Sequence, residues 1–234
     1  MEPQHPDRDA PLIRLVAPDD AGPGSLLGAA RGAAGAASRE ALRRMRDLGS
    51  WLRAQHEAEH RGPRRDPAAV TAALTALQEW PDPARRDAAH RASLARWAAV
   101  LAGRPAPGRS LDGLTLARLG WSADALVVVD TDPAAAPAAL DLGWLTGDLV
   151  ALTHRARAEG GDPGVTEGLL TGFLTGYDGL TASGPGRSLE VRRAAAVRLL
   201  VRAVEQAGTR EGEVDLRLCR LLVERCWAEE RVAS

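Results

Sequence analysis

Two groups of side chains in this sequence have the types and the spacing that support chemistry. The first is His56-Glu57-Ala58-Glu59-His60, which matches the pattern HExxH. On a helix, that spacing puts two imidazoles one turn apart with a glutamate between them, as in many zinc hydrolases. One hypothesis is therefore a zinc hydrolase that uses His56, Glu57 and His60. The charged residues around the motif and the lack of a spaced third ligand argue against it.

The second group is a pair of carboxylates behind a short apolar run. Leu126–Val129 is entirely apolar and is followed by Asp130-Thr131-Asp132-Pro133. Short β-branched runs bounded by turn residues predict buried strands. A carboxylate at the end of such a strand is well placed to hold a metal ion. Asp130 and Asp132 are therefore candidate cation ligands, and the alternative is that they only cap a turn.

The residues after this strand change to a helical period. Leucines recur at three- and four-residue steps from Asp141 onward, which predicts a buried helix face. The order of strand, Asp, loop, Asp-Leu-Gly and helix over Ala125–Leu149 resembles the later half of the catalytic lobe in the aminoglycoside phosphotransferase and choline kinase-like family. Leu48–His56 is similar to the Leu-Ala-x-Leu-His helix of that family, with Gln55 in place of a leucine. This second likeness gives His56 a structural role.

The resemblance implies specific roles for two carboxylates. It makes Asp130 the metal-binding residue at the end of the strand. It makes Asp141 a structural residue that braces the catalytic loop. The family transfers phosphate from ATP·Mg, and its other requirements are a Lys at the nucleotide phosphates, an Asp that orients the acceptor hydroxyl and an Asn on the metal.

The catalytic loop of the resemblance is degenerate in this chain. Counting back from Asp130 puts the family's catalytic His at Leu111, its Asp at Gly113 and its Asn at Arg118. Asp112 is displaced by one residue, which in an extended segment turns a side chain to the opposite face. Arg118 places a cation where a metal ion belongs. Leu111, Asp112, Gly113 and Arg118 therefore lack the family's chemistry.

Composition removes further parts of that chemistry. The 234 residues include no Lys and no Asn, so every basic residue other than histidine is Arg. The segment before the first expected helix has room for about one strand, at Leu12–Val16, and not for a nucleotide-binding lobe. The 30 basic and 31 acidic residues give a formal net charge of −1, which argues against a nucleic-acid or anionic-membrane surface.

The remaining signals predict a mainly α fold with one small β hairpin. The resemblance implies that this fold is the helical C-lobe of a kinase-like fold. We expect residues 1–37 to be mobile or to form a single strand, and 38–234 to form this lobe. Helices are expected over 38–60, 66–80, 83–102, 141–160, 162–177, 189–206 and 214–232, with the hairpin within 111–129. Three of the starts carry Asp-Pro, with Asp as N-cap and Pro in the first turn. Cys219 and Cys226 are expected to be reduced core residues. We expect a cytoplasmic protein, because no apolar run is long enough to span a membrane.

These observations favour a non-catalytic pseudo-phosphotransferase that serves as an accessory or scaffold protein. We expect it to bind a protein or peptide partner, or a second copy of itself, without a cofactor. The family association suggests a bacterial natural-product pathway. The alternative is a phosphotransferase in which a partner supplies the nucleotide lobe and Asp130 still binds Mg²⁺. Loss of that lobe should uncover apolar residues for the partner, with these candidates: Trp51, Leu114, Leu116 and Trp121.

Overall fold

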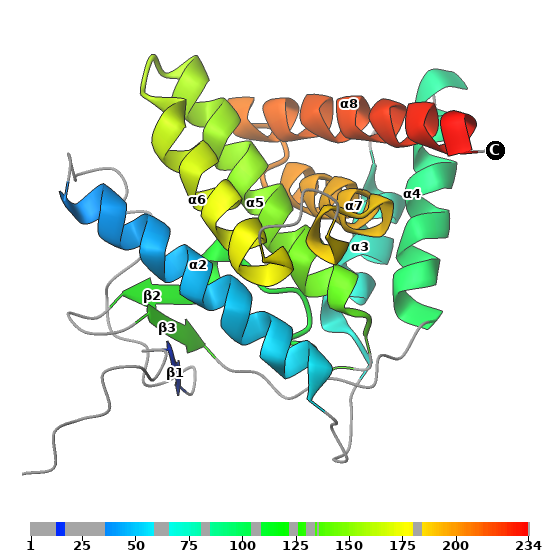
Figure 1. The fold of residues 1–234 in the computed structure, drawn as a ribbon. Helices are drawn as coiled ribbons and strands as arrows, with labels where there is room; N and C mark the ends of the chain where they lie inside the picture. Colours follow the sequence, from blue (N-terminus) through cyan, green and yellow to red (C-terminus); the bar gives the residue numbers. More distant parts are fainter. Residues whose placement is uncertain are drawn as a thin grey trace, which may run out of the picture.

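The computed structural model describes residues 13–16, 36–58, 66–80, 85–103, 109–121, 126–129, 134, 136–179 and 184–233. Within these ranges the chain is mainly helical, as the sequence predicts, with a small β element (Figure 1). The helices are α2 (Ala36–Glu57), α3 (Ala68–Glu79), α4 (Arg85–Gly103), α5 (Ala138–Ala158), α6 (Pro163–Asp178), α7 (Leu189–Glu205) and α8 (Arg210–Ala233). Two short 3₁₀ turns, η2 (Leu116–Arg118) and η3 (Pro185–Arg187), join them.

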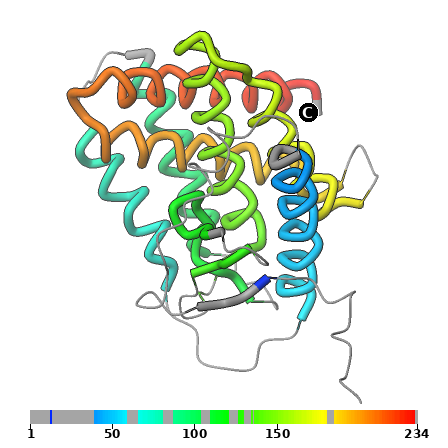
Figure 2. The backbone as a smooth tube through the Cα atoms, turned by 90° about the vertical axis from the view of Figure 1, so that its left-hand side faces the viewer, coloured from blue at the N-terminus to red at the C-terminus, as the bar shows by residue number. Residues whose placement is uncertain are grey.

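The strands form one small sheet in the order β1-β3-β2. β2 (Leu119–Trp121) and β3 (Leu126–Val129) form the expected hairpin, with Leu119 opposite Val128. β1 (Ile13–Val16) pairs with the other edge of β3 in parallel, from Ile13 beside Leu126 to Val16 beside Val129. The N-terminal segment therefore contributes a strand to the sheet. Figures 1 and 2 place this sheet at the opposite end of the helical body from α8.

The helices pack in layers around α5 and α7, which are buried along most of their length. α2 lies along α6 on one side of α5, while α3 and α4 lie on the other side (Figure 2). The core is mostly Leu, Val and Ala, because the chain has few aromatic residues. No helix in the described ranges has both the length and the apolar character needed to cross a bilayer.

Local signals place several helix starts correctly. Asp162 caps α6 by accepting a hydrogen bond from the Gly164 N–H at 2.8 Å, and Pro163 occupies the first turn. Ser188 caps α7 by accepting from the Val191 N–H at 3.3 Å. The expected cap at α3 is wrong: Asp66 lies outside the helix, and the Ala69 N–H donates instead to Asp112 Oδ1 at 3.0 Å. A carboxylate from a distant loop therefore caps this helix.

Candidate functional site

A buried carboxylate, Asp141, organises the loop 110–118 that the resemblance identifies with the catalytic loop. Its side chain is 0% exposed. Oδ1 accepts hydrogen bonds from the N–H groups of Gly113 and Leu114 at 2.8 and 3.2 Å. Oδ2 accepts from the Leu111 N–H at 2.8 Å and from His56 Nε2 at 2.9 Å. A carboxylate that accepts several backbone N–H groups fixes the conformation of the segment that supplies them.

His56 links this carboxylate to α6. Its Nδ1 lies 3.0 Å from the Tyr177 hydroxyl, and the two rings meet edge to face. In a neutral ring whose proton is on Nε2, the ring donates to Asp141 and the Tyr177 hydroxyl donates to Nδ1. Both ring nitrogens are therefore occupied. This geometry argues against His56 as a zinc ligand. α2 ends at Glu57, one residue after it. His60 lies outside the described residues.

Burial changes the acidity of the tyrosine at the end of this chain of hydrogen bonds. Loss of solvent, with a smaller contribution from the Asp141 charge, raises the pKa of Tyr177 to about 12. The protonated phenol is thus favoured in the folded state, so its stabilising contribution is complete below pH 10. That contribution is lost as the pH rises toward 12.

We therefore expect a loss of stability at alkaline pH that depends on Tyr177. Between about pH 9.5 and 11.5, the free energy of unfolding should fall by about 2 kcal/mol from this group. Tyr177→Phe should remove that part of the fall. The chain has one Tyr, so the absorbance of the phenolate reports this residue alone. A phenol that titrates in the folded protein near pH 10 would contradict the expectation. The fall that remains in Tyr177→Phe should come from the cysteines, since burial also raises the pKa of Cys219 and Cys226.

The loop residues aligned with catalytic groups serve structural purposes. Asp112 is buried, has φ = +60° and uses Oδ1 to cap α3. Gly113 has φ = +78°, which strains any residue with a side chain. A Cβ at Gly113 would lie 2.8 Å from Trp144 Cδ1 and 2.9 Å from Ala69 Cβ. The position aligned with the family's catalytic Asp therefore has no room for a carboxylate.

Arg118 joins the loop to the hairpin. Its guanidinium donates to the Leu111 carbonyl at 2.5 Å and to the Val129 carbonyl at 3.0 and 3.2 Å. Val129 is the last residue of β3, so the cation lies at the end of this strand. Asp130 and Asp132 themselves lie outside the described residues. No cluster of three or more potential metal-ligating side chains occurs in the part of the chain that the structure describes.

A second carboxylate, Asp148, supports the other end of the loop and was missed by sequence reasoning. Asp148 Oδ2 accepts from the Leu116 N–H at 2.9 Å. Its Oδ1 accepts from Arg198 Nε at 2.8 Å and from Arg202 Nη1 at 3.2 Å. Arg202 Nε also donates to Asp215 at 2.9 Å, which extends the network to α8. The available signal was spacing, because Asp148 follows Asp141 by two helical turns and so shares its face.

The expected apolar interface on this loop is wrong. Leu114 is 0% exposed and Leu116 is 5% exposed, so both belong to the core of the chain itself. The reason is that Asp141 and Asp148 hold the backbone of the loop against α5, which turns these leucines inward. Trp51 on α2 is half-buried and packs partly against the core. The side chain of Trp121 lies outside the described residues.

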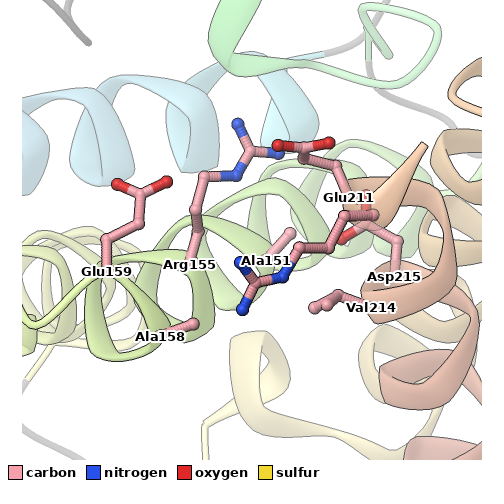
Figure 3. A pocket seen from close by; sticks show the side chains of 8 residues that line it. Ala151, Arg155, Ala158, Glu159, Glu211, Val214 and Asp215 are labelled. Atoms are coloured by element: carbon pink, nitrogen blue, oxygen red, sulfur yellow. The ribbon is translucent and has the colours of Figure 1, made fainter.

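A small crevice lies between α5 and α8 (Figure 3). Asp215, the end of the charge network, is buried at its wall, and this burial raises the pKa of the carboxyl group. The crevice contains no residue of loop 110–118, so it is separate from the aligned catalytic loop. Its lining residues are Ala151, Arg155, Ala158, Glu159, Arg210, Glu211, Val214 and Asp215.

Comparison with protein-family models, with curated proteins and with solved structures gave no match to this chain.

Proposed function

We propose that this protein is a non-catalytic relative of the aminoglycoside phosphotransferase-like fold that acts by binding a protein or peptide partner. One observation carries the proposal. At Gly113, where the family places the Asp that orients the acceptor hydroxyl, the backbone is left-handed and Trp144 occupies the space of a side chain. The conformation of the loop leaves no space for that carboxylate.

The arrangement around Asp141 supports the kinase-like lobe. A loop, a short hairpin and a buried helix follow one another in the chain, and the first turn of that helix supplies the carboxylate that holds the loop. The resemblance assigns this bracing role to Asp141. His56 lies at the end of α2, where the similarity to the family's Leu-Ala-x-Leu-His helix places a structural histidine. Support for the fold thus comes from three contacting segments that are far apart in the sequence.

The hydrogen bonds of the polar side chains in and around loop 110–118 support the loss of catalysis. Phosphoryl transfer needs carboxylate and amide ligands that face the metal ions and the nucleotide phosphates. Here Asp112 caps a helix, Asp141 accepts hydrogen bonds from backbone N–H groups, and Arg118 donates to two carbonyls. The chain contains no Lys for the phosphates and no Asn for the metal. Loss of a single charge-stabilising group slows such reactions by a factor of about 100 to 1,000.

Two features of the chain, a half-buried tryptophan and the edges of the sheet, support a partner-binding role. Trp51 is half-buried on α2, and Trp is enriched among residues that anchor protein interfaces. The small sheet ends in edge strands, which are templates for pairing with another extended chain. These features favour contact with a macromolecule over turnover of a small substrate.

Calorimetric titration with ATP and Mg²⁺ tests the proposal. We expect no binding at micromolar concentrations and no phosphate transfer, because the groups that hold the nucleotide are absent. Gly113→Asp should not restore either activity, since a side chain at that position collides with Trp144. Micromolar affinity for ATP·Mg that is abolished by Asp130→Ala would overturn the proposal. That result would favour the phosphotransferase that a partner subunit completes.

A further inference from the structure

A small cleft between α4, the start of α5 and the start of α7 combines an apolar lining with one cation. α4 packs against α7 here, and the residues that begin α5 complete the wall. The apolar lining residues are Trp97, Val100, Leu101, Pro137 and Ala139. The charged lining residues are Glu190 and Arg193, both near the start of α7. An apolar lining with a few polar groups is typical of sites that bind small molecules.

Two buried N–H groups of residues at this cleft have no acceptor among the described residues. Trp97 is only 3% exposed, and its indole Nε1 makes no hydrogen bond there. The Nε of Arg193 is likewise buried without an acceptor. Buried donors in folded proteins are normally satisfied, because loss of hydration without a replacement hydrogen bond is unfavourable. Two such donors at one cleft favour a ligand that brings an acceptor atom.

The guanidinium of Arg193 is held at the cleft by contacts on two sides. It lies over the Trp97 ring, with Cζ 5.6 Å from the ring centroid. Its Nη2 donates to Glu230 at 2.6 Å, and Arg96 approaches the same carboxylate at 4.0 Å. Two arginines share one carboxylate, so the three groups together carry a positive charge. Glu190 opposes that charge, but it is exposed, so water and salt screen it more than they screen a buried group.

We propose that this cleft binds a small monocarboxylate with an apolar body. The carboxylate accepts from the N–H groups of Trp97 and Arg193, and the apolar body covers Val100, which is 42% exposed. Charge-assisted hydrogen bonds are about twice as strong as neutral ones, so the site selects a carboxylate over an amide. The charge of Glu190 disfavours a second negative charge on the ligand. This inference goes beyond the proposed function, because it requires no partner protein.

Phenylacetate and its neutral analogue phenylacetamide test this selectivity on the full-length chain. Each ligand is titrated into isotope-labelled protein while NMR follows the indole N–H signals of the six Trp residues. Trp97→Phe assigns the Trp97 signal. We expect phenylacetate to shift that signal with a dissociation constant of about 1 mM or lower. Phenylacetamide should bind about tenfold more weakly.

Trp80 is the internal control for the NMR measurement. Its Nε1 is also buried without an acceptor in the described ranges, but Trp80 does not line the cleft. Its signal should therefore stay in place in both titrations. A phenylacetate shift of the Trp80 signal equal to that of Trp97 would overturn the inference, because binding would then not be confined to the cleft.

Arg193→Gln and Arg192→Gln form a matched pair of variants. Both arginines lie on α7 and pair with a glutamate of α8, Glu230 for Arg193 and Glu229 for Arg192. Only Arg193 lines the cleft. We expect Arg193→Gln to weaken phenylacetate binding at least about tenfold and Arg192→Gln to bind like the wild type. Circular dichroism checks that both variants retain their helices.

The absence of a Trp97 shift with phenylacetate would overturn the inference, as would equal binding of phenylacetate and phenylacetamide. Equal losses in the two arginine variants would also overturn it, because the charge of Arg193 would then have no local role. The comparison of the two ligands uses the wild type, so it decides the question if Arg193→Gln does not fold. Tight ATP·Mg binding would overturn the proposed function and leave these outcomes unchanged.

Discussion

Asp141→Ala is expected to lower the free energy of unfolding by about 4 kcal/mol or more, the largest effect of any single substitution considered for this chain. The carboxylate is fully buried and accepts from three backbone N–H groups and from His56. Each buried donor left without an acceptor costs about 1–3 kcal/mol. Several are orphaned at once, and they lie in one short loop, so the loop should also lose its conformation.

Denaturant unfolding of Asp141→Ala beside Asp162→Ala provides the measurement. Asp162 caps α6 through one hydrogen bond at an exposed site, so its loss should cost only about 1 kcal/mol. The two variants remove the same chemical group. The difference between their free energies of unfolding therefore isolates the effect of the buried network. Similar unfolding free energies for the two variants would show that Asp141 does not hold the loop.

Gly176→Ala is expected to destabilise the chain by about 3 kcal/mol, although Ala favours helix formation by about 1 kcal/mol over Gly. α2 and α6 approach so closely that a Cβ at Gly176 would lie 1.9 Å from the Arg46 carbonyl oxygen. A Cβ at Gly49, on the facing helix, would lie 2.2 Å from the Phe173 oxygen. Backbone atoms cannot turn aside, so the two helices must separate and give up their shared packing.

Gly103→Ala is the matched control for this prediction. Gly103 is the last residue of α4, and a Cβ there would have no neighbour within 4 Å. The same chemical change should therefore leave stability unaltered or raise it by up to about 1 kcal/mol. Chemical denaturation of both variants gives the comparison. A Gly176→Ala protein as stable as the wild type would mean that α2 and α6 are not in backbone contact.

Asp141 and the contact between α2 and α6 both stabilise loop 110–118. α2 carries His56 to Asp141, and its position is set by the close contact with α6, which carries Tyr177. The Gly176 substitution should therefore also disturb the His56–Tyr177 contact. Burial raises the pKa of Tyr177 to about 12 in the intact chain. A lower pKa of Tyr177 in the Gly176→Ala variant would report that coupling.

The sequence by itself determined which helices form and, to within a few residues, where they begin and end. The Asp-Pro start of α6, the Ser188 cap of α7 and the β-branched run of β3 lie within a few residues of the structure they specify. It also determined the absence of Lys and Asn and the glycine at position 113. Such signals are local, so they can be read without knowing what a segment contacts.

Only the tertiary structure decided how distant polar groups are used. Asp112 was assigned to a degenerate catalytic loop, and it caps α3 by accepting from the Ala69 N–H, 43 residues earlier in the chain. Asp148 drew no attention, and it bonds to a backbone N–H 32 residues away and to two arginines of α7. Leu114 and Leu116 were expected at a surface. The bonds of their N–H groups to Asp141 and Asp148 hold the loop so that both side chains lie in the core. A carboxylate becomes a cap, a brace or a ligand through the donors that surround it, and three-dimensional packing alone brings those donors together.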